Sequence, residues 1–306
     1  MKTTFAFTVL FLSFYLTFAQ DNNRNFQTSS FNELELNSYV EQILSIEDDE
    51  QRLSINEALK SLLKTELQKK GAFSFPFDSL TSMSVLTPAD SAFRLFNWSV
   101  PMNDGSYNYE CFMLQRGENG NQLTILKPIL VDTIDVEFEK FKGNANEWPQ
   151  ALYYKIISKE TFNRKYYTLL AWDGHNRLTK RKWIEVFWFD RNGELQMGAP
   201  IFKQERKARL LRPVFRYSAQ HAMKMDYNPS KDRIEFDYLA PENSRLEGVY
   251  EYYFPDVTQD AFRWNNDYWE FEKLIDNEEK SKRDKKRIEK QKKEIILENG
   301  AIYESN

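Results

Sequence analysis

The spacing of apolar residues predicts a helical segment followed by a long β segment. Between residues 30 and 71, apolar side chains recur three and four positions apart, as at Leu36, Val40 and Ile43, which is the spacing of one helix face. The acidic segment 47–50 interrupts this pattern. We therefore predict a helical hairpin over residues 30–71. We expect its apolar faces to cover the β domain, and the alternative is a groove offered to a protein partner.

Short-range signals predict the ends of the second helix. Ser54, with Glu57 three residues later, has the form of a capping box, in which each side chain binds the other residue's backbone N–H. Gly71 can adopt the left-handed backbone conformation that ends many helices. The second helix is therefore predicted to begin after Ser54 and to end before Gly71.

From residue 72 to residue 272 the apolar pattern changes to the period of two that is typical of strands. Asp173-Gly174 and Asn192-Gly193 are turn signals, because these pairs supply the positive φ of a tight hairpin. The segment 183–189 is apolar on both faces, so its strand needs cover on both sides. We predict a mainly β fold with one large antiparallel β domain over residues 72–272. A curved sheet, a sandwich or a barrel fits this pattern, and a small propeller is the second possibility.

The end of the chain is charged and lacks an apolar face. No apolar residue occurs between Asp276 and Arg287, and Glu278 and Lys282 form a favourable pair four positions apart. We predict a charged helical tail over residues 273–306.

The first residues have the composition of a secretory signal peptide. Lys2 supplies a positive charge, residues 5–18 are mostly apolar, and Ala19 is a small residue suited to a cleavage site. We predict a signal peptide at residues 1–19 and a mobile polar arm at residues 20–29. The mature protein is then exported and has no transmembrane anchor. The periplasm is its expected location, and secretion or association with the outer membrane are the alternatives.

Charge and cysteine content narrow the classes of partner. The chain has 42 Lys and Arg residues against 46 Asp and Glu residues, and this mild acidity gives no reason to expect a nucleic-acid partner. The single cysteine, Cys111, cannot form an intramolecular disulfide, and it lies in a strand-like segment where a buried apolar residue is expected.

Catalytic and metal-binding motifs are not recognised. His175 and His221 are the two histidines, and with Cys111 they supply at most three of the ligands that zinc takes. We therefore predict no metal and no cofactor. Ser218 and His221 are close in sequence, but an offset of three places them on opposite faces of a strand. No catalytic residue is assigned.

Aromatic residues are the best candidates for ligand binding. Indole and phenol rings give a large contact area at low entropic cost, but a β domain of this size also needs many large residues, and packing in the core is the role that we favour for them. The candidates are Trp172, Trp188, Tyr252, Trp264 and Trp269. Acidic residues in or beside strands could instead perform glycoside hydrolysis, which needs two carboxyl groups at a set separation. These acids are Asp173, Glu185, Asp190, Glu235 and Asp237.

Two stretches resemble a family of uncharacterised exported proteins of Bacteroidetes-type bacteria. The first is FPFDSLTSMSVLTPADSAFRLFNW, and the second is YYTLLAWDGHNRLTKRKWIEVFWFDRNG, which is followed by RPVFRYSAQHAMKMDY and FDYLAPE. The resemblance covers most of residues 74–262. It implies an exported bacterial protein, and it carries no activity and no catalytic residue.

Together these observations predict an exported envelope or secreted protein with a non-enzymatic binding or scaffold role. Its partner would be an envelope component, a glycan or a protein. The alternative is a glycan-binding or glycan-hydrolysing protein that uses the aromatic and acidic residues named above.

Overall fold

The computed structural model describes residues 31–118, 120–129, 138–161, 163–204 and 209–274. The predicted signal peptide, the predicted arm, and the predicted tail beyond Leu274 lie outside the described residues. The described chain is mainly β, with two helices near its beginning, as the apolar pattern predicts.

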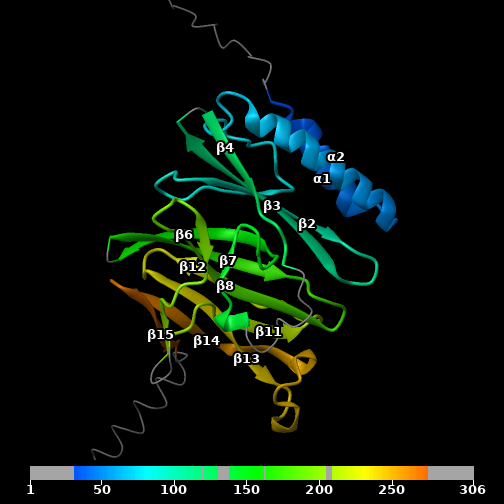
Figure 1. Cartoon of the computed structure of the whole chain (residues 1–306). Coiled ribbons are helices and arrows are strands. Elements are labelled where there is room, and N and C mark those ends of the chain that lie inside the picture. The colour runs from blue at the N-terminus through cyan, green and yellow to red at the C-terminus, as the bar shows by residue number, and fades with distance from the viewer. Residues whose placement is uncertain (1–30, 119, 130–137, 162, 205–208, 275–306) are drawn as a thin grey trace, which may run out of the picture.

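Two helices form the predicted hairpin. The first, α1 (Glu33–Ser45), buries Leu36, Val40 and Ile43 on one face. Those side chains share a core with the first sheet, so the hairpin lies on that sheet as a lid (Figure 1). Burying each of these side chains stabilises the fold by about 1.5–3 kcal/mol.

The second helix, α2 (Asp49–Gln68), begins earlier than the predicted cap at Ser54. The side chain of Asp48 accepts a hydrogen bond from a backbone N–H of the first turn at 2.8 Å, so Asp48 caps the helix in place of Ser54. The added turn carries Arg52, whose Nε donates to the carbonyl of Ile43 at 3.1 Å. This contact with the end of α1 is tertiary, and a local capping pattern does not include it.

Three sheets follow the hairpin. The first sheet has the order β1-β2-β3-β4, and the third has the order β10-β15-β14-β13-β12. The second has the order β5-β9-β8-β7-β6, with β11 paired to β8. Among the described strands, every pairing is antiparallel except the parallel pairing of β10 with β15.

The strands have the following bounds. The first sheet contains β1 (Ser84–Leu86), β2 (Arg94–Pro101), β3 (Tyr107–Gly117) and β4 (Gly120–Ile125). The second contains β5 (Gly143–Asn144), β6 (Leu152–Thr161), β7 (Arg164–Asp173), β8 (Thr179–Phe189), β9 (Leu195–Met197) and β11 (Val214–Ser218). The third contains β10 (Phe202–Lys203), β12 (Met225–Asn228), β13 (Arg233–Pro241), β14 (Tyr253–Asn265) and β15 (Tyr268–Leu274). Short 3-10 helices are η1 (Phe138–Lys140), η2 (Ser244–Leu246) and η3 (Tyr250–Tyr252).

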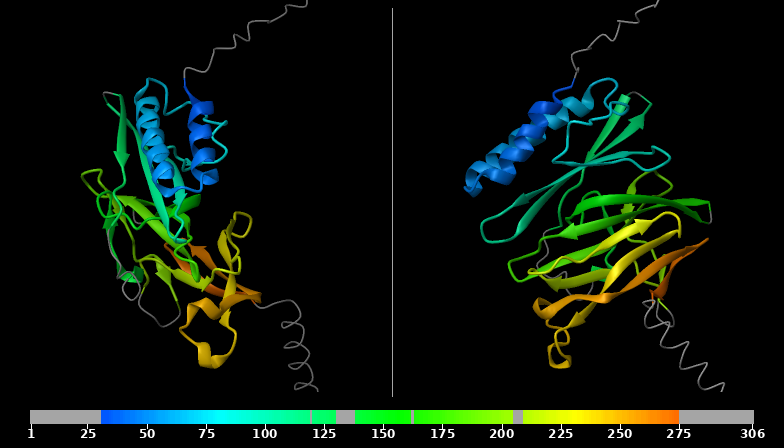
Figure 2. Two further views of the ribbon diagram at one scale, coloured as in Figure 1. Left: turned by 90° about the vertical axis from the view of Figure 1, so that its right-hand side faces the viewer. Right: turned by 180° about the vertical axis from the view of Figure 1, so that it is seen from behind.

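The helices and the three sheets are stacked in succession, with a hydrophobic core in each interval (Figures 1 and 2). β8 shows why both faces of the middle sheet are apolar. Trp183 and Phe187 pack toward the first sheet, whereas Ile184 and Val186 pack toward the third. This confirms the prediction that the strand over 183–189 is covered on both faces.

The two predicted turns differ in how they use glycine. Gly193 has a φ of 78°, as the Asn-Gly signal predicts. At Asp173-Gly174 the residue with positive φ is instead His175, at 53°. Only glycine fits at position 174, because a Cβ atom there would clash with the ring of Tyr107 at 2.1 Å.

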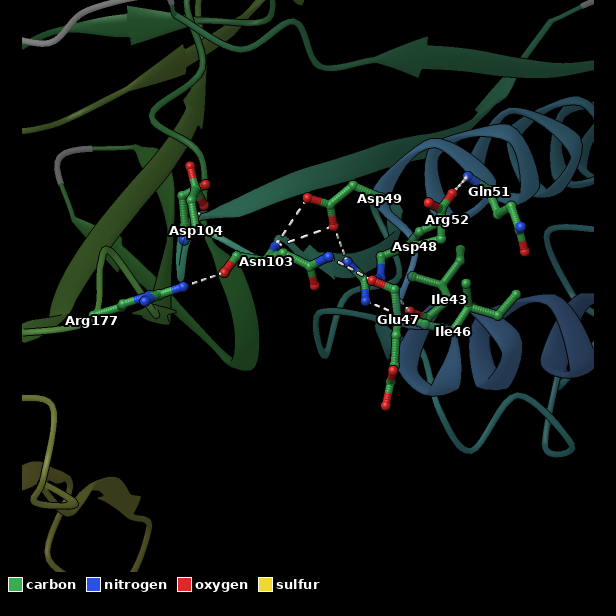
Figure 3. A network of polar contacts seen from close by, with 11 residues as sticks. Ile43, Ile46, Glu47, Asp48, Asp49, Gln51, Arg52, Asn103, Asp104 and Arg177 are labelled. Atoms are coloured by element: carbon green, nitrogen blue, oxygen red, sulfur yellow. Dashed lines mark hydrogen bonds and ion pairs between the residues drawn. The ribbon is translucent and has the colours of Figure 1, made fainter.

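Asn103, in the turn between β2 and β3, joins the helical hairpin to the second sheet (Figure 3). Its backbone N–H donates to the Asp49 carboxylate at 3.1 Å, and its Nδ2 donates to the Glu47 carbonyl at 2.6 Å. Arg177, from the loop between β7 and β8, donates through Nη2 to the Asn103 carbonyl. Arg52 binds the same Asp49 carboxylate, so one network holds three layers at this edge.

Candidate functional site

A cavity of about 390 Å³ opens where β11 of the second sheet meets the third sheet and η3. Its apolar side is built from phenylalanine rings, with Phe215 and Phe236 at 4.6 Å and Phe236 and Phe262 at 5.6 Å between ring centroids. Its polar side holds Glu139, Asp237, Asp260, Arg216, Tyr250 and Tyr253. A pocket with an apolar base and a few converging polar groups is the usual form of a small-molecule site.

Asp260 is the polar group that distinguishes this cavity. It pairs with Phe236 across β13 and β14, and it lies two residues before the buried Phe262, so the period of two points its side chain inward. The residue is only 5% exposed, and its Oδ1 has no hydrogen-bond partner among the described residues. A buried acceptor left unpaired costs about 1–3 kcal/mol, and such a group calls for a bound water or a ligand donor.

The ionisation of Asp260 reflects this environment. Burial raises the pKa of its carboxyl group, because the charged form loses hydration. The positive charge of Lys273, which pairs with Asp260 across β14 and β15, offsets part of that rise.

The neighbouring polar groups are held in place by their own contacts. Asp237 accepts hydrogen bonds from the Lys224 backbone N–H at 2.6 Å and from Gln259 Nε2 at 3.2 Å. The Arg216 guanidinium lies over the Tyr250 ring at 5.4 Å. These contacts orient the wall of the cavity before any ligand binds, which lowers the entropic cost of binding.

Two of the predicted aromatic residues, Trp264 and Trp269, lie together with ring centroids 5.2 Å apart. Trp269 is fully buried, and its Nε1 donates to Thr168 Oγ1 at 3.0 Å. The Lys159 ammonium lies 5.4 Å from the centroid of each of these rings and is ion-paired with Asp232. A cation from the chain itself therefore occupies the space over this pair.

The other three predicted aromatic residues lie in separate places. Trp172 packs edge-on to Tyr107 at 5.3 Å, and Trp188 has the Arg164 guanidinium over its ring at 4.5 Å. Tyr252 is 42% exposed in η3, beside the cavity residues Tyr250 and Tyr253. The five residues do not form one platform, and their role in ligand binding stays a prediction.

Most of the predicted acids have structural partners. Asp173 binds Arg181 and the Tyr109 hydroxyl, Glu185 binds Arg212, Asp190 accepts two backbone N–H groups of its own turn, and Glu235 binds Arg233. Asp237 is the predicted acid that lines the cavity. Asp260 was missed, although its place on the same strand face as Phe262 and Trp264 is visible in the sequence.

The remaining sequence candidates have simple surroundings. Cys111 is fully buried, and burial raises the pKa of its thiol. His175 lies in the turn after β7, where its Nδ1 is 3.1 Å from Thr179 Oγ1. Within the described ranges, no three His, Cys, Asp or Glu side chains are grouped so as to hold a metal ion. No helix in those ranges is long and apolar enough to span a membrane.

Comparison with known proteins does not assign the chain to a family. No protein-family model matches the chain, and no curated protein matches it. Among solved structures, a family GH32 β-fructofuranosidase from Bombyx mori aligns with a TM-score of 0.24 and 7% sequence identity. The alignment covers 62% of this chain and 35% of that enzyme. A likeness at this level carries no argument about fold or function.

Proposed function

We propose that this chain is an exported, non-enzymatic binding protein that takes a neutral, hydroxyl-rich ligand such as a glycan in the cavity beside Asp260. The observation that carries the proposal is Asp260, a buried residue that lines a cavity with tyrosine and phenylalanine walls and whose Oδ1 has no donor among the described residues.

The charges around the cavity disfavour an anionic ligand. Three carboxyl groups, those of Glu139, Asp237 and Asp260, line it with one arginine, Arg216. Carboxylates accept hydrogen bonds from ligand hydroxyl groups and repel anions. Tyrosine rings add apolar contact area, which suits the C–H face of a sugar ring. The volume is within the range of small-molecule sites and allows a short saccharide.

Glycan hydrolysis is the second candidate, because Glu139 and Asp260 line the same cavity. Hydrolysis needs one carboxyl group as acid and a second as base or nucleophile. Asp237 is a poor choice for either role, since both of its oxygens already accept hydrogen bonds. Binding without turnover is therefore the leading proposal, and release of reducing sugar from any bound glycan would establish hydrolysis in its place.

Binding of the protein to an array of neutral, acidic and basic glycans tests the proposal. We expect a neutral glycan to bind, and we expect Asp260→Asn to weaken that binding about tenfold, as expected for loss of a charge-assisted hydrogen bond. The control is Glu118→Gln, which removes an exposed carboxylate in the turn between β3 and β4. Equal binding by the wild type and Asp260→Asn would contradict the proposed site.

Export is tested separately. The proposal rests on the composition of residues 1–19. N-terminal sequencing of the protein made in a Gram-negative host should show a start at Gln20 in the periplasmic fraction. An intact Met1 in the cytoplasmic fraction would contradict export and leave the cavity proposal untouched.

A further inference from the structure

A second cavity, of about 650 Å³, lies at one end of the middle sheet. It shares no lining residue with the cavity beside Asp260. Three cations line it together with tyrosine and amide side chains: Arg164, Lys165, Arg191, Tyr166, Tyr167 and Asn163.

The topology explains why these residues meet. β7 lies between β6 and β8, so the turn that leads into β7 and the turn that follows β8 are at the same end of the sheet. Tyr167 of β7 pairs with Phe187 of β8. Extending that antiparallel register by three residues places Arg164 level with Asp190, next to Arg191.

Arg164 is held by an aromatic ring. Its guanidinium lies 4.5 Å from the centroid of the Trp188 indole ring, and in the described part of the chain it forms no ion pair. Stacking on an aromatic face orders the planar group, and Arg164 is exposed, so its N–H groups are accessible to a ligand. Arg191 is also exposed and likewise has no ion pair within the described ranges.

The remaining charges at this cavity are already engaged. Lys165 Nζ binds Asp90 at 2.8 Å, and the Tyr167 hydroxyl donates to the same carboxylate at 3.0 Å. Asp190 accepts the backbone N–H groups of Asn192 at 2.9 Å and Glu194 at 3.0 Å. Asp90 and Glu160 both act on Lys165, and Asp190 is committed to its turn. Arg164 and Arg191 are therefore the cations of this cavity that have no carboxylate partner within the described residues.

We infer that this cavity is an anion-binding site that takes a phosphate group, free or carried on a small organic ester, between Arg164 and Arg191. The planar fork of arginine matches the oxygen geometry of phosphate and forms paired, charge-assisted hydrogen bonds. The Lys165–Asp90 pair adds a nearby donor, and the Tyr166 ring supplies an apolar wall for the ester. This inference is independent of the proposed function, because the two cavities share no lining residue and are proposed to take different ligands, a neutral glycan in the first and a phosphate group in the second.

Calorimetric titration of the purified mature protein tests the site with three probes: inorganic phosphate, a hexose monophosphate and the same hexose without phosphate. Sodium chloride at equal ionic strength controls for screening. We expect saturable binding of the phosphate-bearing probes with a Kd of about 1 mM or lower. Any heat from the neutral hexose would come from the cavity beside Asp260 and should be the same in Arg164→Gln. Tighter binding of the ester than of inorganic phosphate would identify the ester as the preferred source. An absence of saturable phosphate binding up to about 10 mM would overturn the inference.

Variants that each remove one positive charge distinguish a specific phosphate site from attraction of phosphate by the net charge of the protein. Arg164→Gln and Arg191→Gln should each weaken phosphate binding about tenfold, and Arg164→Lys should recover little, because it keeps the charge and loses the fork. The control is Arg245→Gln, an exposed arginine in η2 that is remote in sequence from both turns. Equal weakening by Arg245→Gln would show that net charge alone attracts phosphate.

The fluorescence of Trp188 gives a second measurement of phosphate binding that is independent of calorimetry. Because Arg164 is stacked on this indole, phosphate bound at Arg164 should change its fluorescence emission. Trp188→Phe should remove most of that change while the calorimetric binding remains within about threefold of wild type. An emission change that persists in Trp188→Phe would place the anion elsewhere.

Discussion

Glu185 and Arg212 form an ion pair in which neither side chain is exposed, with Arg212 Nε 2.8 Å from Glu185 Oε2. Arg212 also donates through Nη1 to the carbonyl of Phe138 at 2.7 Å, and its guanidinium lies 4.5 Å from the Phe138 ring centroid. The pair therefore attaches η1 to the middle sheet. This structural role explains why Glu185, a sequence candidate for hydrolysis, is removed from solvent.

Arg212→Met should destabilise the protein by about 3–5 kcal/mol, because it leaves Glu185 charged and unpaired in the core. Replacing both residues, as in Glu185→Leu with Arg212→Met, should recover much of that loss, since no buried charge then remains. Urea unfolding followed by circular dichroism measures both effects. A loss below about 1 kcal/mol in the single variant would show that water reaches Glu185.

Asp260→Asn should stabilise the unliganded protein by about 1 kcal/mol near neutral pH, because it removes a buried charge that has no donor among the described residues. The stability difference should depend on pH. Burial raises the pKa of Asp260 in the folded state. Asp260 therefore contributes stability to the folded wild type below the usual aspartate pKa of 3.8, and this contribution is lost as the pH rises through the folded-state pKa. Thermal unfolding from pH 3 to pH 7 should show the variant gaining relative to wild type.

If Asp260 had a structural role and did not bind ligand, the change in stability caused by Asp260→Asn would have the opposite sign. If Asp260 held the fold together, Asp260→Asn would lower the melting temperature at neutral pH. Gain of stability with loss of binding is the combination expected of a binding residue.

Lys159→Ala should destabilise the protein by about 1–2 kcal/mol, because its ammonium interacts with the rings of Trp264 and Trp269 and with Asp232. Loss of the cation should also shift tryptophan emission to longer wavelength as water reaches the rings. Lys155→Ala, on the same strand, removes only a surface pair with Asp226 and should change stability by less than about 0.5 kcal/mol. Similar losses from both variants would show that the aromatic contacts add nothing.

Asn56→Leu should loosen the helical hairpin. Trp98 Nε1 donates to Asn56 Oδ1 at 2.7 Å, and Asn56 Nδ2 donates to Glu110 Oε1 at 3.1 Å, so the variant leaves a buried N–H without its acceptor. We expect a loss of about 1–3 kcal/mol and faster hydrogen exchange in α2. Thr65→Ala, on the exposed face of α2, should change stability by no more than about 0.5 kcal/mol. Unchanged exchange in Asn56→Leu would show that apolar packing alone holds the hairpin.

Local periodicity predicts much of this fold. The period of two over 183–189 correctly indicates a strand covered on both faces, and the spacing of Leu36, Val40 and Ile43 correctly indicates a helix face. The predicted start of α2 was wrong. α2 begins at Asp49 and includes Arg52, which donates a hydrogen bond to the Ile43 carbonyl at the end of α1, and a local capping motif does not encode that tertiary contact.

The candidate site could be predicted only in part. Asp260 shares a strand face with Phe262, which marks it as an inward acid. Its cavity, however, exists because β11 pairs with β8 in the middle sheet and so lies opposite β13 and β14. That placement depends on long-range pairing, and no local pattern around residues 214–218 reports it.

The most direct test of the binding proposal is the carboxyl ¹³C resonance of Asp260 in aspartate-labelled protein, assigned by its absence from Asp260→Asn. We expect this resonance to titrate at a higher pH than that of an exposed aspartate and to shift when a neutral glycan saturates the protein. An Asp260 resonance that stays unmoved while glycan binds would contradict the proposal that the ligand lies against Asp260.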